Sequence, residues 1–441
     1  MGENTKKNHV AKQPPMGWNS WDCYGASVNE EALLGNAKYM ADNLKKYGWK
    51  YIVCDIQWSE STADSFEYKK FTELDMDEYS RLIPAVKRFP SSEGGKGFKP
   101  IADKIHDMGL KFGIHIMRGI PRQAVHRNTA VLGTDQTARQ IAHPSSVCAW
   151  NTDMYGVDPD AKDAQCYYDS IFMLYAEWGV DYVKVDDIAA TRYTPQAPGA
   201  VVSEIEMIHK AIDKCGRKMV LSLSPGPARR DEADFFLQNA NLWRMTDDFW
   251  DNWKDLYNMF ERADVWTGVG CKDHWPDCDM LPLGKIAGMG EGGKGLSYRK
   301  SRFTHSEQRM LMTLWCMFRS PLMFGGEMRD NDEFTNSLLT NSRILAMHHD
   351  GRHAKQISRK KDIVTWRSES KLGVRYLAIF NLNDEPKESK LDFKEYKLEK
   401  DSSIGAIDMW TNTGVTLEDG ARIEIPAHSV ICYEIDPPKG E

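Results

Sequence analysis

Short apolar runs that alternate with amphipathic stretches over most of the chain predict an α/β fold, a (β/α)₈ TIM barrel. Eight runs have the length and composition of strands, namely Gly17–Trp21, Tyr51–Ile56, Lys111–Ile116, Tyr182–Asp186, Met219–Ser224, Leu242–Thr246, Val265–Gly268 and Pro321–Phe324. The stretches between them show helical periodicity, as in Glu30–Lys46, Gly97–Met108, Gln165–Trp178, Val202–Cys215, Phe249–Arg262 and Glu307–Phe318. A doubly wound sheet is the alternative fold, but it usually has fewer strands.

The pattern changes after about residue 355 to short β-type runs separated by charged turns. These runs are Ile363–Arg367, Arg375–Leu382, Ile404–Met409, Thr416–Leu417, Ile423–Ile425 and Ser429–Ile435. They predict a C-terminal antiparallel β-sandwich domain. We therefore expect a disordered N-terminus over residues 1–13, a catalytic barrel over 14–352 and the β domain over 353–441.

Two long segments follow predicted strands and should lie on the face of the barrel where active sites form. Residues 118–165 include several Arg and Pro residues, and residues 283–306 are rich in Gly and Lys. Long connections without clear periodicity are often functional. Within the second segment, Gly288–Gly295 partly fits a phosphate-binding loop but lacks the Ser or Thr after Lys294, so a mobile loop is the preferred interpretation over nucleotide binding.

Composition excludes several classes of protein. A chain of 441 residues suggests a large domain with a smaller one. The net charge of -7 is mild and no basic stripe occurs, which argues against a nucleic-acid partner. No apolar run approaches the ~18 residues that a membrane span needs. Fourteen Trp residues are typical of sugar-binding clefts, although most should simply pack in the core.

Cysteine and histidine patterns predict neither a disulfide framework nor a metal site. Nine Cys are scattered without a C-x-x-C pair. His348 and His349 follow a helix-like stretch, so we interpret them as a helix C-terminus. The first residues contain no apolar signal segment, which fits a cytoplasmic protein or an exported one whose signal has been removed, and the compartment stays unknown.

Two aspartates, Asp186 and Asp248, each follow an apolar run, where a parallel barrel presents catalytic groups. Two carboxylates across one pocket are the minimum for cleaving a glycosidic bond. Alternation along a strand places Lys184 on the same face as Asp186, where its charge would keep the carboxylate ionised as a nucleophile, unless the two form only a structural ion pair. The same parity places Arg244, Thr246 and Asp248 on one face of a strand, while Asp187 and Asp247 are expected to be solvated or helix-capping.

The motifs together resemble glycoside hydrolase family 27, the α-galactosidase family, over nearly the whole chain. Similar to the family signatures are Met16-Gly-Trp-Asn-Ser-Trp21-Asp, Tyr168-Asp169 through Trp178-Gly-Val-Asp-Tyr-Val-Lys184-Val-Asp186, Trp243-Arg244 with Asp248, Trp275-Pro-Asp-Cys-Asp279-Met-Leu, and Leu314-Trp315 with Ser320-Pro-Leu322. Each motif alone is modest, but their order and spacing are specific.

The resemblance implies retaining exo-hydrolysis, with Asp186 as nucleophile and Asp248 as acid/base. It further implies that Trp21 stacks on the sugar, that Asp55 and Lys184 bind its 3- and 4-hydroxyls, and that Arg244 binds its 2-hydroxyl. Asp279 is expected to close the rim of the site, and His115 occupies a position where the family often has an aromatic residue. No metal or cofactor is implied. The expected partner is an oligosaccharide or plant-polysaccharide substrate, and a homo-oligomer stays open.

Two departures from the family pattern concern specificity. Ile56 replaces an aspartate that holds the sugar's 6-hydroxyl, and leaving that hydroxyl unpaired costs roughly 1–3 kcal/mol. β-L-Arabinopyranose lacks this group, and some family members cleave it, so we expect β-L-arabinopyranosides to be preferred over α-D-galactosides. Ser224-Pro-Gly-Pro-Ala228 replaces a motif that reads the 2-hydroxyl, which leaves an α-N-acetylgalactosaminidase as the alternative, unless Arg244 reads that hydroxyl alone. A non-catalytic carbohydrate-binding barrel is the alternative from another class.

Overall fold

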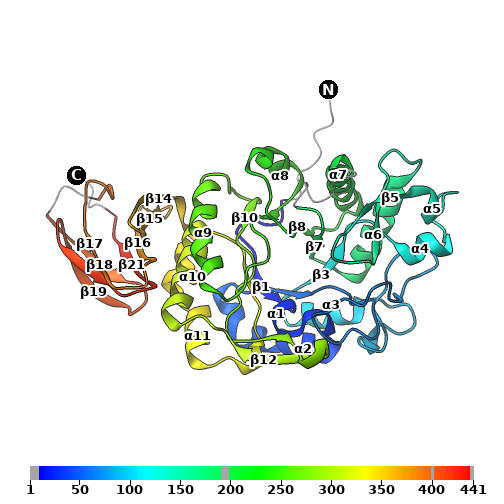
Figure 1. The fold of residues 1–441 in the computed structure, drawn as a ribbon, viewed down its shortest axis with the longest axis horizontal. Helices are drawn as coiled ribbons and strands as arrows, with labels where there is room; N and C mark the ends of the chain where they lie inside the picture. The colour runs from blue at the N-terminus through cyan, green and yellow to red at the C-terminus, as the bar shows by residue number, and fades with distance from the viewer. Residues whose placement is uncertain (1–8, 190–197, 399–401, 438–441) are drawn as a thin grey trace.

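The computed structural model describes residues 9–189, 198–398 and 402–437. Figure 1 shows a barrel encircled by helices and a separate β domain beside it. The barrel sheet has eight strands, in the order β10-β9-β8-β7-β3-β2-β1-β13, and every adjacent pair is parallel. Their bounds are β1 Met16–Asn19, β2 Tyr51–Cys54, β3 Lys111–Met117, β7 Tyr182–Asp186, β8 Val220–Leu223, β9 Leu242–Arg244, β10 Trp275–Asp277 and β13 Leu322–Phe324. The predicted fold class is confirmed.

The two edges of this sheet meet at Leu281, just beyond the end of β10. Leu281 forms an isolated parallel bridge with Phe324 of β13. Its N–H donates to the carbonyl of Met323 at 2.8 Å, and its own carbonyl accepts from the N–H of Gly325 at 3.0 Å. The curled sheet therefore closes through a short contact instead of a full ladder, next to the segment that carries Asp279.

The seventh strand was predicted in the wrong place. Val265 is the last residue of helix α9 (Trp253–Val265), and half of its side chain is exposed. The seventh strand is Trp275–Asp277, which pairs with β9 so that Asp277 lies opposite Arg244. A strand of three residues that contains Pro276 has no alternation to recognise, whereas the apolar pair Val265-Trp266 imitates one.

Helices flank the sheet as the sequence predicted, with bounds α2 Glu30–Tyr39, α3 Lys99–Asp107, α6 Ala164–Trp178, α7 Pro198–Cys215, α9 Trp253–Val265 and α10 His305–Phe318. Short helices that the pattern did not predict are α1 Trp21–Tyr24, α8 Ala233–Asn239 and α11 Glu333–Leu339. Helix α12, Ser342–Asp350, ends at the histidine pair, as predicted. Across the described ranges, none of the helices has the length and apolar character to cross a membrane.

Local capping explains where the main helices begin. The side chain of Asn29 accepts from the N–H of Ala32 at the start of α2, and Asn252 caps α9 in the same way. Thr304 and Glu307 form a capping box at α10. The N-terminal segment is ordered earlier than predicted: residues 1–8 lie outside the described part, but Ala11 is buried and its carbonyl accepts from Trp275 Nε1 at 2.8 Å.

Both long segments contain structure of their own. Residues 118–165 form β4 (Ile120–Pro121), α4 (Arg122–Arg127), α5 (Ala138–Ile141), β5 (Ala142–Val147) and β6 (Met154–Val157), with an antiparallel sheet in the order β4-β6-β5. This module lies on the side of the barrel away from the C-terminal domain (Figure 1). The segment Gly288–Gly295, expected to be a mobile loop, lies at the turn of a hairpin between β11 (Lys285–Met289) and β12 (Leu296–Lys300).

The C-terminal domain is antiparallel, as predicted. One sheet has the order β14-β15-β16-β21-β18-β19 and a second pairs β17 with β20. Their bounds are β14 Arg352–Lys360, β15 Ile363–Glu369, β16 Arg375–Asn381, β17 Lys387–Lys390, β18 Ser403–Asp408, β19 Thr413–Glu418, β20 Arg422–Ile425 and β21 Ser429–Ile435. Strands β14 and β17 escaped prediction because their sequences are mostly polar or charged.

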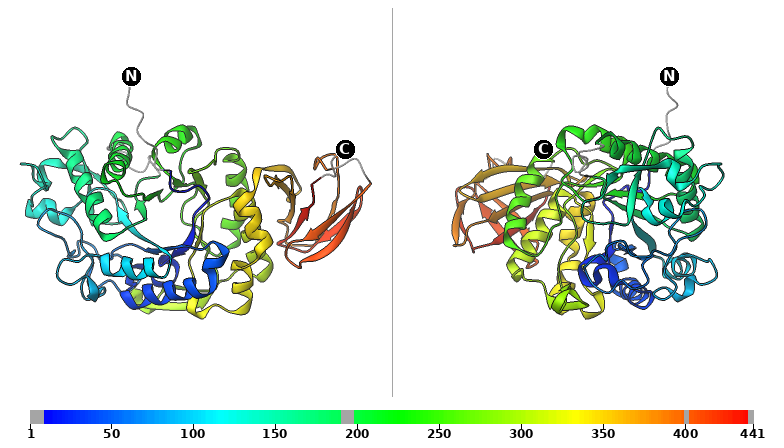
Figure 2. Two further views of the ribbon diagram at one scale, coloured as in Figure 1. Left: turned by 180° about the vertical axis from the view of Figure 1, so that it is seen from behind. Right: turned by 45° about the vertical axis from the view of Figure 1, so that its right-hand side comes forward.

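The β domain packs on the barrel through an apolar interface at α9 and α10, which lie between the two units (Figures 1 and 2). The ring centroids of Phe260 in α9 and Phe380 in β16 are 4.9 Å apart. Trp366 and Cys432 belong to the same buried apolar cluster as the barrel core. The hydrophobic core therefore continues from the barrel into one face of the β sheet, and we expect the two units to unfold together.

Phe380→Ala should lower the free energy of unfolding by about 3–5 kcal/mol, because it leaves a cavity at this interface. The measurement is a denaturant unfolding curve. Phe71→Ala is the matched control: the Phe71 side chain is 72% exposed, so this change should stay within about 0.5 kcal/mol of the unmodified protein. Equal curves for the two variants would contradict a stabilising interface.

Candidate active site

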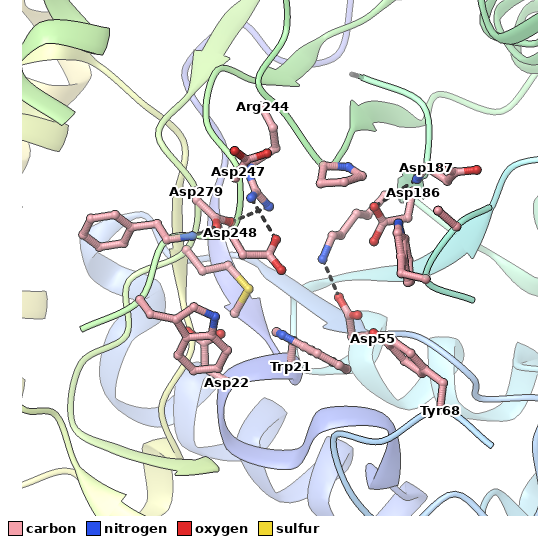
Figure 3. A pocket seen from close by; sticks show the side chains of 17 residues that line it. Trp21, Asp22, Asp55, Tyr68, Asp186, Asp187, Arg244, Asp247, Asp248 and Asp279 are labelled. Carbon is pink, nitrogen blue, oxygen red and sulfur yellow. Dashed lines mark hydrogen bonds and ion pairs between the residues drawn. The ribbon is translucent and has the colours of Figure 1, made fainter. Parts of the chain in front are cut away.

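A cavity of about 520 Å³ opens among the C-terminal ends of the barrel strands (Figure 3). Seven of the predicted site residues lie on its wall: Trp21, Asp55, Lys184, Asp186, Arg244, Asp248 and Asp279. Asp186 and Asp248 stand on opposite sides of it, with Trp21 below them in the view of Figure 3. The wall also holds Asp22, Tyr68, Ala149, Trp150, Asp187, Pro225, Asp247, Phe249, Trp250 and Met280.

Asp186, the last residue of β7, is held as a carboxylate. Its Oδ2 lies 2.9 Å from Nε2 of His115, and its Oδ1 accepts from the N–H of Asp187 at 3.0 Å. Burial disfavours the charged form, but His115 and then Lys184 outweigh it and hold the pKa of Asp186 well below the usual range. His115 is fully buried behind the carboxylate, so it orients Asp186 from outside the cavity.

A second ion pair lies between the ends of β7 and β2. Lys184 Nζ donates to Oδ2 of Asp55 at 3.0 Å, and Asn19 Nδ2 donates to the same oxygen at 2.7 Å. Burial opposes the charges on both partners, yet Asp55 and Asp186 raise the pKa of Lys184, and Lys184 and His115 lower the pKa of Asp55. Both groups are therefore charged, and they present one donor and one acceptor to the cavity.

Arg244, at the end of β9, joins the two acids on the opposite wall. Its guanidinium lies 2.8 Å from Oδ1 of Asp279 and 3.0 Å from Oδ1 of Asp248. The Arg244 side chain is 4% exposed, whereas that of Asp248 is 62% exposed. The strand ends at Arg244, so Asp248 does not follow from strand parity: it lies in the loop and points back to the arginine.

Buried acids surround this arginine. Burial and the neighbouring Asp279 raise the pKa of Asp277 to about 7, and burial also raises the pKa of Asp279. Asp22 is buried and its Oδ2 has no hydrogen-bond partner among the described residues. Burial, with Asp279 nearby, raises the pKa of Asp22 well above its usual value. Protonated acids thus limit the negative charge that accumulates at the cavity floor.

Comparisons with known proteins agree with this geometry. The family models for "Alpha galactosidase A" and "Alpha galactosidase C-terminal beta sandwich domain" match residues 156–350 and 360–435. A Geobacillus stearothermophilus structure, a GH27 β-L-arabinopyranosidase, is 54% identical, with 98% of each chain covered and a TM-score of 0.93. The chain belongs to glycoside hydrolase family 27.

Other relatives in the family carry different names. A Bacillus halodurans structure, described as a candidate α-N-acetylgalactosaminidase, is 51% identical over 96% of this chain and 97% of its own, with a TM-score of 0.85. Arabidopsis thaliana alpha-galactosidase 2 is 25% identical over 92% of this chain and 85% of its own. As a member of this family the protein is a glycoside hydrolase, which sets aside the non-catalytic alternative.

Three residues expected to contact the sugar lie behind the cavity wall of this family 27 enzyme. Ile56 is 2% exposed and belongs to an apolar cluster against which Trp21 and Tyr68 pack. Ser224 is buried, and its hydroxyl points at the carbonyl of Val185 at 3.4 Å. The third is His115, described above. The geometry therefore favours an indirect role for these three residues, in which each acts on the substrate through a neighbouring residue on the wall.

Sequence reasoning missed most of the loop residues on the wall. Trp150 lies in the 118–165 segment that was expected to be functional, and Trp250 follows Asp248 closely. The position of each residue in the chain was therefore the available sequence signal for its place on the cavity wall. The expectation for Asp187 was wrong: instead of being solvated it pairs with the buried Arg118 at 2.9 Å, and burial raises its pKa to about 6. Asp247 is exposed, as expected.

Asp277 should make stability fall as pH rises. Its pKa in the folded protein is about 7 and its unfolded value is near 3.8, so its stabilising protonation is complete below about pH 4 and is lost as pH rises through 7. Denaturant unfolding at pH 4 to 8 should show that Asp277→Asn loses less stability across this window than the unmodified protein. Asp247→Asn controls for the loss of one formal charge. Parallel profiles for Asp277→Asn and the unmodified protein would refute the assignment.

Proposed function

We propose that this family 27 enzyme hydrolyses terminal β-L-arabinopyranosides with retention of configuration, by double displacement. The observation that carries the proposal is the placing of Asp186 and Asp248 on opposite sides of one cavity, in contrasting surroundings. Asp186 is enclosed and kept ionised, while Asp248 stands at the open side, tethered by Arg244. The 54% identity to a β-L-arabinopyranosidase supports the choice of sugar.

In the first step, a carboxylate oxygen of Asp186 attacks the anomeric carbon as the glycosidic bond breaks. The protonated Asp248 gives its proton to the leaving oxygen, so the aglycone departs as a neutral alcohol. His115 fixes the orientation of Asp186 through its hydrogen bond, which places the attacking oxygen without a contact to the sugar itself. The product of this step is a covalent glycosyl-enzyme.

In the second step, the ionised Asp248 takes a proton from water, and the oxygen of that water attacks the anomeric carbon. The bond to Asp186 breaks, and its electron pair returns to the carboxylate. Two inversions give net retention. The groups near Asp186, chiefly His115 and then Lys184, stabilise the carboxylate as a leaving group, since the same factors lower its pKa.

The remaining wall residues bind the sugar. Lys184 and Asp55 hold the 3- and 4-hydroxyls as a donor and acceptor pair, and Trp21 stacks against the ring. Arg244 donates to the 2-hydroxyl. Its guanidinium lines the cavity, and a sugar hydroxyl there would give it an acceptor besides Asp248 and Asp279.

The preference for a pentose follows from the apolar surroundings of Ile56. This residue packs in a cluster with Ala26, Met117, Cys148 and Met154, behind the part of the wall formed by Trp21 and Tyr68. A galactose 6-hydroxyl directed at this cluster would lose its water without gaining an acceptor, at a cost of roughly 1–3 kcal/mol. β-L-Arabinopyranose places no polar group there.

An α-N-acetylgalactosaminidase is the second candidate function. Pro225 lines the cavity and Ser224 lies behind it, where related enzymes are expected to have larger groups that read the 2-hydroxyl. Small residues at this place would leave room for a 2-acetamido group. The 51% identity to the Bacillus halodurans protein favours keeping this candidate. Activity on nitrophenyl α-N-acetylgalactosaminide that exceeds activity on the arabinopyranoside would select it.

Removing either carboxylate should identify its role. Asp186→Ala should lose activity on nitrophenyl β-L-arabinopyranoside by at least about a thousandfold, since the covalent step has no nucleophile. Added azide should then give the α-L-arabinopyranosyl azide, attacking from the side that Asp186 vacates. Asp248→Ala with azide should give the β-L azide instead, because azide replaces water in the second step. Product configuration is read by NMR, and undiminished activity of Asp186→Ala would exclude it as nucleophile.

Substrate preference tests the role of Ile56. The unmodified enzyme should favour nitrophenyl β-L-arabinopyranoside over the α-D-galactoside by about 10–200-fold in kcat/KM. Ile56→Asn, which adds a neutral hydrogen-bonding group, and Ile56→Asp should both narrow this ratio, while Ile56→Val should preserve it. A wide preference of the unmodified enzyme for the galactoside would show that the apolar cluster does not set the choice of sugar.

A further inference from the structure

The backbone just after Asp186 adopts a left-handed conformation. Asp187 has a φ angle of 59°, in a region that L residues enter at a cost, although Asp tolerates it better than most. The N–H of Asp187 donates to Oδ1 of Asp186 at 3.0 Å, while Oδ2 of Asp186 lies 2.9 Å from Nε2 of His115. The turn at Asp187 therefore holds one carboxylate oxygen of Asp186, and whatever fixes this turn also orients the carboxylate.

Arg118, the residue after β3, fixes the turn through its backbone and its side chain. Its N–H donates to the carbonyl of Asp186 at 3.1 Å, and its Nε donates to the carbonyl of Asp187 at 2.7 Å. Its Nη2 forms an ion pair with Oδ2 of Asp187 at 2.9 Å. One guanidinium thus contacts both the backbone and the carboxylate of Asp187, which leaves the turn little freedom to rotate.

The other side of the turn is tied to β8. The N–H of Ile188 donates to the carbonyl of Ser224 at 3.0 Å, and the N–H of Ser224 donates to the carbonyl of Val185 at 2.8 Å. Strands β3 and β8 are the two neighbours of β7 in the sheet, so the turn is held from both sides. The connection to β3 includes an ion pair, and its strength therefore depends on the charge of Asp187.

Arg118 is itself supported by a second buried acid. Its Nη1 lies 2.9 Å from Oε1 of Glu204 and 2.9 Å from Oγ of Ser146. The Arg118 side chain is 2% exposed and that of Glu204 is fully buried. Gly156 leaves the space for this arrangement, because a Cβ there would lie 2.5 Å from Ser146 Oγ and 3.0 Å from Arg118 Nη1. The guanidinium is therefore a rigid support for the turn.

The charges of these buried groups depend on one another. Burial opposes the charge of Arg118, but Glu204 and then Asp187 raise its pKa, so it is a cation. Burial raises the pKa of Asp187 to about 6 although Arg118 acts against the rise. The titratable groups that face Asp187 are Arg118, Asp186, Glu204 and Cys148. At neutral pH Asp187 is ionised and paired, and in mild acid it takes up a proton.

Direct contact with the sugar is the alternative role for Asp187, because this residue lies on the cavity wall. Its side chain is 11% exposed, and its carboxylate is occupied by the pair with Arg118. Figure 3 shows the side chain of Asp187 directed away from the space between Asp186 and Asp248. The geometry therefore favours an action of Asp187 on Asp186 over an action on the substrate.

We propose that Asp187 is a positioning residue for the nucleophile, and that its ion pair with Arg118 holds the turn that aims the Asp186 carboxylate at the anomeric carbon. The inference rests on the proposed glycosidase function, because it needs Asp186 as the nucleophile. It adds a dependence on pH. As Asp187 takes up a proton in mild acid, its contact with Arg118 loses one of its two charges, and the turn loosens.

Asp187→Asn tests the ion pair, because Asn keeps the shape of the side chain and tolerates the left-handed region but carries no charge. With nitrophenyl β-L-arabinopyranoside at pH 7, it should lower kcat and kcat/KM equally, by about tenfold, since a misplaced nucleophile weakens only the transition state. The kcat of the unmodified enzyme should fall as pH drops through about 6, whereas that of Asp187→Asn should be low and flat. Asp187→Gly, which also frees the backbone, should lose at least as much activity.

The matched control lies at the other end of β7. Arg217 donates to the carbonyl of Val180 at 2.7 Å and forms an ion pair with Asp181 at 2.8 Å. This arrangement repeats the one at Asp187, but at the opposite end of the strand from the nucleophile. Asp181→Asn should therefore leave kcat and its pH profile unchanged. Thermal unfolding of both variants shows whether each remains folded.

Full kcat in Asp187→Asn, a change in KM alone, or an equal loss of kcat in Asp181→Asn would overturn the inference, as would an acid limb that persists in Asp187→Asn. The proposed function fails separately, if Asp186→Ala keeps its activity. An inactive Asp186→Ala beside a fully active Asp187→Asn refutes the positioning role alone. If the unmodified enzyme does not cleave the arabinopyranoside, the same variants are compared on the terminal sugar that it does cleave.

Discussion

The balance between buried acids and two buried cations governs the geometry of the active site. Carboxyl groups crowd the C-terminal mouth of the barrel, and within the described residues of the cavity wall only Lys184 and Arg244 carry positive charge. Lys184 pairs with Asp55, and Arg244 joins Asp248 to Asp279. Ion pairs this deeply buried stabilise a site only if each charge is matched, since an unmatched charge in the interior is costly.

This balance assigns different states to chemically identical side chains. Asp186 is ionised because His115 and Lys184 overcome the effect of burial, whereas at Asp22 the effect of Lys184 does not outweigh burial and the neighbouring Asp279. Asp277 also holds its proton near neutrality, because burial and Asp279 act against its charge. The environments thus separate Asp186, a permanent anion suited to act as a nucleophile, from buried acids of the same chemical type that keep their protons.

The sequence predicted best those features that a regular repeat encodes. Eight strands with helices between them were recognised in number, and seven were placed correctly, because apolar periodicity reflects burial on both faces of a parallel sheet. The seventh strand, Trp275–Asp277, has too few residues for any periodicity. Lys184 and Asp186 were found by strand parity, but Asp248 lies beyond the end of β9, so only its place after an apolar run pointed to it.

Residues held by long-range contacts could not be predicted in the same way. Tyr68 and Trp150 reach the cavity because side-chain bonds join their loops, through Thr152 and Gln57, and neither loop has a repeating pattern. The same limit explains why the ion pair of Asp187 was not predicted, since its partner Arg118 lies just after the end of a neighbouring strand. Short-range pattern carries no information about which distant side chain will supply the counter-charge.

The two departures from the family pattern both lie one layer behind the cavity, which changes how they act. Ile56 supports Tyr68 and Trp21 through an apolar cluster, and Ser224 lies behind Pro225. A residue in this position alters specificity by deciding which side chain forms the wall and whether a polar group there could be satisfied. Tyr68 belongs to both sets of contacts, since it packs on the cluster around Ile56 and against Trp150. A change at Ile56 should therefore be felt at Tyr68 and, through the packing of that ring, at Trp150.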